Sequence, residues 1–197
     1  LKPANILIDQ YLFPKISDFG LSKDIGDYNE LLSSGFKGTY AYSAPEIFYD
    51  NTYTKMSDVY AFAMIVYEIL TEKNVYEIMT GDFPYHNVTQ FQLTNQVPKG
   101  FCPEFKSDIP TCYRNLIETC WSNNPKERPT FDEIVELLQT DPEFITECVD
   151  EGEFIDYIDF IDESISKYDS QLKYPDPVIQ YSIVETLDMS KYRLSNK

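Results

Sequence analysis

The segment 59–70, with the sequence VYAFAMIVYEIL, is apolar at nearly every position. A helix that is apolar around its whole circumference must be surrounded by other elements of the same protein. Ser57, just before it, has a side chain suited to capping a helix N-terminus. The longest apolar run, 61–66, is far shorter than the roughly 20 residues that span a bilayer. We therefore expect a buried helix that forms the hub of a core.

Two further segments have helical periodicity. In the segment 111–121, TCYRNLIETCW, helical spacing puts four residues on one face: Tyr113, Leu116, Ile117 and Cys120. The segment 130–139, TFDEIVELLQ, opens with the Thr130–Glu133 spacing of a capping box. We expect both to be surface helices that pack on the hub, which makes the fold mainly α.

A small β-hairpin is predicted at the start of the chain. The apolar segments ILID and FPKIS are separated by QYL, and Pro14 confines its strand to a sheet edge. The open end of this hairpin brings Asn5 and Asp18 side by side. From Asp18 to Glu46 few apolar positions recur, and glycine and serine are frequent. Loops of that length in compact domains are usually functional lids or disordered.

Composition excludes several classes of function. The chain is 43% hydrophobic, enough for a core, and its formal net charge is −17. Phosphate-backbone binding needs clustered Lys and Arg, so nucleic acid is not an expected partner. The four cysteines show no C-x-x-C spacing and are expected to be reduced, buried thiols. Neither a membrane span nor a signal peptide is present, and we expect a soluble, cytoplasmic protein.

Lys2, Asn5 and Asp18 together suggest a site for phosphoryl transfer. Magnesium prefers oxygen ligands and usually takes only one or two from the protein. Asp18 and Asn5 supply a carboxylate and an amide carbonyl, and Lys2 is a donor for the transferred phosphate. Each residue alone has a simpler reading, because an aspartate before a glycine is often a turn residue and an asparagine before a strand is often a cap.

The order of these motifs resembles the eukaryotic protein kinase catalytic domain. LKPANILID is similar to the catalytic loop after H-R-D, SDFG to the metal-binding D-F-G, and KGTYAYSAPE to the end of an activation segment. Further along, SDVYAF and CWSNNPKERPTF resemble the helical C-lobe, in the form typical of the tyrosine-kinase-like group of Ser/Thr kinases. The resemblance covers residues 1–140 and implies a kinase C-lobe fragment that uses ATP and Mg²⁺ on a protein substrate.

The resemblance implies a role for each matching residue. Lys2 corresponds to the lysine that contacts the γ-phosphate, Asn5 to the ligand of the second metal, and Asp18 to the principal metal ligand. Gly20 would let the segment pivot. Thr39 matches the hydroxyl residue that packs against the catalytic-loop lysine in Ser/Thr kinases.

Three more positions match structural residues of the same family. Glu46 and Arg128 correspond to a buried ion pair that holds the activation segment to the helices; otherwise they are two unrelated surface charges. Asp58 corresponds to the aspartate that holds the catalytic-loop backbone, and it also suits the first turn of a helix.

Other parts of the family pattern are missing from the sequence. H-R-D, with its catalytic base, would lie immediately before Leu1, and no G-x-G-x-x-G loop or V-A-I-K lysine occurs. We therefore expect an absent N-lobe and a chain that is inactive in isolation. Two hypotheses remain: a fragment of a Ser/Thr protein kinase, or a non-catalytic interaction module that retains only a C-lobe.

The composition changes after residue 140. Between Arg128 and Lys167 there are thirteen Asp or Glu residues and no Lys or Arg. Within 153–165, EFIDYIDFIDESI sets apolar side chains at helical spacing, namely Phe154, Tyr157, Ile158, Ile161 and Ile165. This predicts an acidic amphipathic helix that either folds onto the lobe or meets a basic partner. We expect residues 141–197 to be an acidic extension, with KYPDPVIQ as an extended linker.

Overall fold

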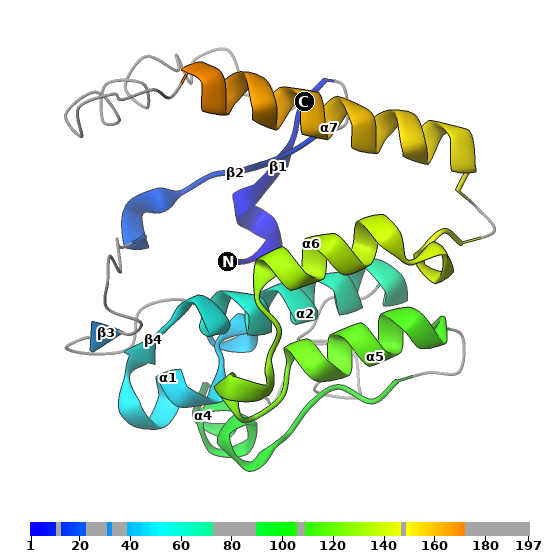
Figure 1. Ribbon diagram of the computed structural model, residues 1–197. Coiled ribbons are helices and arrows are strands. Elements are labelled where there is room, and N and C mark those ends of the chain that lie inside the picture. Colours follow the sequence, from blue (N-terminus) through cyan, green and yellow to red (C-terminus); the bar gives the residue numbers. More distant parts are fainter. Residues whose placement is uncertain are drawn as a thin grey trace, which may run out of the picture. The chain divides into compact units, whose positions relative to one another are not determined.

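The computed structural model of the chain describes residues 1–10, 13–22, 31–32, 39–72, 90–105, 109–146 and 149–171 (Figure 1). The chain divides into two compact units, Leu1–Phe144 and Ile145–Lys197. The domain boundary that the composition predicts at residue 140 stays a prediction. The predicted linker KYPDPVIQ lies outside the described residues.

The first unit is mainly helical, as predicted. Its described α-helices are α1 (Pro45–Asp50), α2 (Lys55–Thr71), α4 (Gln90–Gln96), α5 (Thr111–Cys120) and α6 (Phe131–Thr140). Short 3-10 turns accompany them: η1 (Pro3–Asn5), η2 (Phe19–Leu21), η3 (Tyr40–Tyr42), η4 (Val97–Lys99), η5 (Pro125–Glu127) and η6 (Pro142–Phe144). In Figure 1, α2 lies between α5 and α6, and it packs closely against α5.

Helix α2 is the predicted hub. Eight of its seventeen residues are buried, and they lie on several sides of the helix; they include Val59, Tyr60, Ala63, Met64 and Tyr67. These side chains belong to one core cluster that also takes in residues of η3, α1, α4, α5 and α6. The all-round apolar sequence of this helix is therefore explained by neighbours on most of its circumference.

Ser57 was predicted to be the N-cap of α2, but the N-cap lies three residues earlier. Thr54 is the N-cap, since its backbone is extended and its hydroxyl accepts a hydrogen bond from the Ser57 backbone N–H at 3.2 Å. The Ser57 hydroxyl in turn accepts from the Thr54 backbone N–H at 3.1 Å. Both residues thus form a capping box, with Ser57 already inside the helix.

The predicted properties of α5 and α6 are confirmed. Leu116, Ile117 and Cys120 of α5 are buried, and the half-buried Tyr113 donates its hydroxyl hydrogen to the Phe144 carbonyl at 3.0 Å. In α6, Thr130 and Glu133 form the predicted capping box.

Two antiparallel pairs of short strands complete the first unit. β1 (Ile6–Ile8) pairs with β2 (Pro14–Ile16), with Ile6 opposite Ile16 and Ile8 opposite Pro14. This is the predicted hairpin. β3 (Leu31–Leu32) pairs with β4 (Thr52–Tyr53), which the sequence analysis did not anticipate. The second pair joins the described part of the long 18–46 segment to the chain between α1 and α2.

The second unit contains one long helix, α7 (Glu151–Gln171). It includes the segment predicted to be helical, and its first turn carries Glu151 and Glu153. Phe154, Ile158 and Ile161 are half-buried. Whether the helix folds onto the lobe or meets a basic partner stays a prediction. Among the described helices, none has the length and apolar character needed to cross a membrane.

Candidate active site

The hairpin places Asn5 and Asp18 at the same end of two paired strands. The Asn5 carbonyl accepts hydrogen bonds from the Ser17 backbone N–H at 2.8 Å and from the Ser17 hydroxyl at 3.0 Å. Asp18 follows Ser17, two residues after β2 ends. This juxtaposition was predicted from the sequence, but the role of the Ser17 hydroxyl was not, because its only sequence signal is a hydroxyl residue directly before the aspartate.

Lys2 lies one turn before Asn5. Its backbone is extended, and its carbonyl accepts a hydrogen bond from the Asn5 N–H at 3.0 Å. Pro3 occupies the first position of η1, where its fixed φ favours the turn and its missing N–H costs nothing. The three predicted site residues therefore lie on two adjoining segments, with the backbone of Asn5 bonded to both.

Asp18 has an unusual backbone conformation. Its φ and ψ are 60° and 67°, in the left-handed region that non-glycine residues rarely occupy. Its side chain is exposed, and a Cβ on Gly20 would lie 3.3 Å from the Asp18 Oδ1 atom. Asp18 thus presents an exposed carboxylate from a left-handed backbone, and a glycine two positions later leaves room beside it.

Four apolar side chains of the hairpin and of η2 are exposed. Leu7, Ile8, Ile16 and Phe19 are between 47% and 59% exposed. The hairpin is a two-stranded sheet, so among the described residues neither strand has a further strand paired to its outer edge. Exposed apolar side chains that gather on one segment commonly mark an interaction surface.

Asp58, in the first turn of α2, contacts the chain segment that carries Lys2. Its Oδ1 atom lies 3.4 Å from the Leu1 backbone nitrogen. The predicted role of Asp58 in holding the catalytic-loop backbone stays a prediction.

The predicted Glu46–Arg128 pair is confirmed and lies in the core. Arg128 Nη1 and Nη2 donate to Glu46 Oε1 at 2.8 Å and to Oε2 at 2.9 Å, and both residues are 4% exposed. Such a bidentate arrangement is the strongest form of a charge-assisted hydrogen bond. The Ser57 hydroxyl also donates to Glu46 Oε1, at 2.8 Å.

Two further N–H groups of Arg128 also form hydrogen bonds. Nη1 donates to the Met56 carbonyl at 2.9 Å, and Nε donates to the Ser122 carbonyl at 2.8 Å. The guanidinium also lies 5.1 Å from the centroid of the Tyr60 ring. Burial raises the pKa of the Tyr60 hydroxyl well above its ordinary value. This network fixes α1, which contains Glu46, to the start of α2 and to the segment between α5 and α6.

Part of the long loop lies outside the described residues, including its hydroxyl-bearing residues Tyr28, Ser33 and Ser34. Thr39 is described: it is half-buried, precedes η3, and its carbonyl accepts from the Ser43 hydroxyl at 3.1 Å. Its contact with Lys2 stays a prediction.

Comparison with known proteins decides the family. A sequence model for the protein kinase domain matches residues 1–138. The chain belongs to the protein kinase family. The helical unit with its small hairpin is therefore a kinase-like C-lobe, and the predicted resemblance is confirmed at the level of the family.

Relatives among characterised proteins differ in specificity. A probable LIM domain-containing serine/threonine-protein kinase of Dictyostelium discoideum is 35% identical over 146 residues, 74% of this chain and 14% of the relative. The dual specificity protein kinase shkD of the same organism is 35% identical over 148 residues, 75% of this chain and 18% of the relative. The mouse tyrosine-protein kinase TXK is 31% identical over 138 residues, 70% of this chain and 25% of the relative. The chain thus spans a quarter or less of these kinases.

Proposed function

We propose that the chain is the C-lobe part of a protein kinase that transfers the γ-phosphoryl group of ATP to Ser or Thr of proteins. The observation that carries the proposal is the hairpin, whose paired strands bring Asn5 and Asp18 to one end beside Lys2. The family match supports the same reaction class.

The donor chemistry of this end of the hairpin suits magnesium. The Asp18 carboxylate and the Asn5 amide carbonyl are oxygen donors, and Asp18 is exposed. When bound, magnesium neutralises the charge on the ATP phosphates. We infer that Asp18 and Asn5 would hold the metal and that the Lys2 ammonium would bind the transferred phosphate. The exposed apolar side chains of the hairpin offer a surface against which the missing part of the nucleotide site could pack.

Transfer to Ser or Thr is the finer part of the proposal. Lys2, Pro3 and Thr39 resemble the Ser/Thr kinase pattern, since tyrosine kinases carry alanine and arginine in place of the Lys-Pro pair. SDVYAF and CWSNNPKERPTF favour the tyrosine-kinase-like group. A peptide array phosphorylated by the complete protein should be labelled at Ser and Thr. Labelling confined to tyrosine would contradict this specificity.

The direct test is mutagenesis in the complete kinase. Asp18→Asn should lower the rate of phosphate transfer at least about a hundredfold, because it removes the charged oxygen donor that would hold the magnesium ion. Asp9→Asn is the matched control: Asp9 lies at the other end of the same hairpin, where its carboxylate accepts from the Phe13 N–H at 2.9 Å. If Asp18→Asn retains full activity, the assignment of the site is wrong.

The 197 residues on their own are expected to be inactive. They contain no H-R-D, no G-x-G-x-x-G loop and no V-A-I-K lysine. A general base alone contributes about 10²- to 10⁴-fold to a rate. Phosphoryl transfer further depends on groups that position the phosphates. Asp18-dependent phosphorylation by the purified chain would contradict this expectation.

A second candidate is a non-catalytic interaction module that retains only a C-lobe. The two candidates differ in ATP binding by the complete protein. A kinase should bind ATP in the presence of Mg²⁺ and lose this binding with Asp18→Asn, whereas a non-catalytic module should show no Asp18-dependent ATP binding.

We also propose a cytoplasmic location. The described cysteines, Cys102, Cys112 and Cys120, are free thiols, which suits a reducing compartment. Fractionation of cells that express the complete protein would test this, and recovery with secreted proteins would contradict it.

A further inference from the structure

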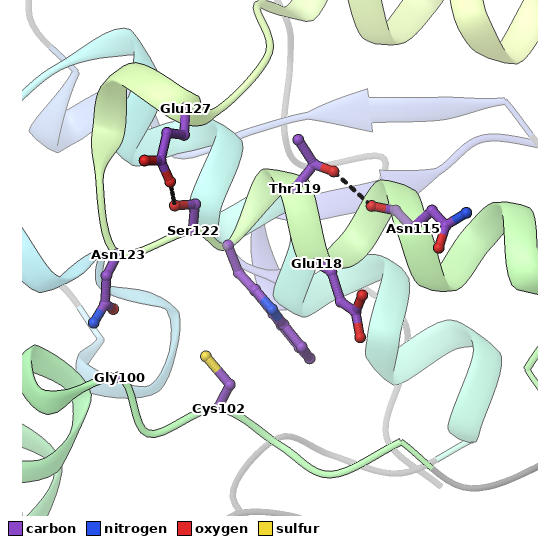
Figure 2. Close-up of a pocket in the computed structure, with 9 residues that line it drawn as sticks. Gly100, Cys102, Asn115, Glu118, Thr119, Ser122, Asn123 and Glu127 are labelled. Atoms are coloured by element: carbon purple, nitrogen blue, oxygen red, sulfur yellow. Dashed lines mark hydrogen bonds between the residues drawn. The ribbon is translucent and has the colours of Figure 1, made fainter.

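A cavity of about 560 Å³ opens beside the C-terminal half of α5, on elements that carry neither Asn5 nor Asp18. Its size is within the range of about 300 to 1,000 Å³ that is usual for ligand pockets. One wall is a single face of α5 and the two residues after it, where Asn115, Glu118 and Ser122 recur at helical spacing (Figure 2). Gly100 and Cys102 lie across the cavity from this wall.

The cavity carries negative charge. Glu118 and Glu127 both line it, and none of the described lining residues is basic. Burial raises the pKa of the Cys102 thiol to about 11, so this thiol is neutral at physiological pH. The ligand that this lining favours is therefore a cation.

The Glu127 carboxylate is held in place before any ligand binds. Its Oε2 atom accepts a hydrogen bond from the Ser122 hydroxyl at 2.7 Å, drawn in Figure 2. Its Oε1 atom accepts from the Asn124 amide at 3.1 Å. These bonds lower the pKa of Glu127, and each oxygen keeps a further lone pair for a ligand donor. A group that is oriented in advance loses little entropy on binding.

Trp121 and Gly100, which also line the cavity, are held in fixed positions. Trp121 is 7% exposed and lies between Tyr67 and Phe105, with ring centroids 5.7 Å and 5.1 Å away. Gly100 has a φ of 86°, and a Cβ at this position would meet the Asn123 amide nitrogen at 3.1 Å. A side chain at residue 100 would therefore crowd the cavity as well as strain the backbone.

We propose that this cavity binds an arginine side chain presented by a partner protein. A guanidinium is a planar cation with five N–H donors, and the lining offers two carboxylates and two amide carbonyls as acceptors. Glu118 and Asn115 are exposed at the wall formed by α5, so an arginine can enter from the surface while its own backbone stays outside. This function is separate from phosphate transfer and does not require the hairpin site.

The single tryptophan of the chain makes the test specific, because Trp121 lines the cavity. The peptide acetyl-Gly-Arg-Gly-amide is titrated into the 197-residue chain while tryptophan fluorescence is recorded. We expect a saturable change. The neutral analogue with citrulline in place of arginine should bind about tenfold more weakly, as expected for the loss of a charge-assisted bond. Equal binding of the two peptides, or no saturable change, would overturn the proposal.

Variants separate a local site from the general attraction of cations to a chain of net charge −17. Glu118→Gln and Glu127→Gln should each weaken arginine binding about five- to tenfold. Glu136→Gln removes the same charge from an exposed position on α6 that does not line the cavity, and it should change binding less than twofold. Equal weakening by all three variants would show diffuse attraction and overturn the proposal. Glu118→Gln keeps the test valid if loss of the Glu127 hydrogen bonds perturbs folding.

Discussion

The Glu46–Arg128 network and the hairpin end at Asn5 and Asp18 both depend on a carboxylate, but in opposite surroundings. Glu46 is buried, and its two oxygens receive three hydrogen bonds from Arg128 and Ser57. Asp18 is exposed and sits on a left-handed backbone. A buried carboxylate that the protein satisfies serves the fold, whereas an exposed carboxylate held on a strained backbone is available to a ligand. The contrast predicts that the two sites respond differently to mutation.

The largest effect is expected at Arg128. Arg128→Ala leaves the Glu46 carboxylate buried without its partner, which typically costs about 3 to 5 kcal/mol. The free energy of unfolding of the 197-residue chain, measured by urea denaturation, should fall by this amount. Lys126→Ala is the control, since Lys126 is exposed and two residues away in η5. An unchanged midpoint for Arg128→Ala would contradict a structural role for the pair.

A much smaller effect on stability is expected at Asp18. Asp18→Asn keeps the side-chain shape and a residue type that tolerates the left-handed conformation. Its free energy of unfolding should stay within about 0.5 kcal/mol of the unmodified chain, as for most exposed positions. The same urea measurement tests this. A loss as large as that of Arg128→Ala would remove the distinction between the two sites.

The smallest effect on stability is expected from protonation of Glu133, an exposed carboxylate that accepts hydrogen bonds. Bonds from the Thr130 backbone N–H and hydroxyl, at 2.7 and 2.9 Å, lower the pKa of Glu133 below its ordinary value. Because the pKa is lowered in the folded state, the stabilisation is present above the ordinary pKa and is lost as the pH falls through the folded value. An NMR titration should find the pKa of Glu133 below the ordinary value for a glutamate. A pKa at or above that value would contradict the capping box.

Patterns within short segments predicted most of the fold. The hub helix, the Thr130–Glu133 capping box and the hairpin all follow from local periodicity and spacing, and all are confirmed. The cap of α2 was misplaced because both Thr54 and Ser57 can cap a helix. Only the bond from Ser57 to Glu46, eleven residues earlier in the chain, shows why Ser57 lies inside the helix.

Features that depend on distant contacts or on backbone angles could not be predicted in this way. The β3–β4 pair joins segments about twenty residues apart and only two residues long each, too short for a periodic signal. The left-handed backbone of Asp18 has no signal in the residue type alone. The cavity beside α5 needs Gly100 and α5 to approach each other, which a linear sequence does not show. For the predicted site, Lys2, Asn5 and Asp18 were found through their motifs, and their roles remain proposals.

The separation of Glu46 and Arg128 along the chain has a consequence for folding kinetics. The two residues are 82 positions apart. Closing so long a loop costs entropy before any contact forms, and distant contacts tend to form late. The ion pair should therefore be absent from the folding transition state. Its loss would then act mainly by speeding unfolding, leaving the folding rate nearly unchanged. In this way the pair would set how long the lobe stays folded once it has formed.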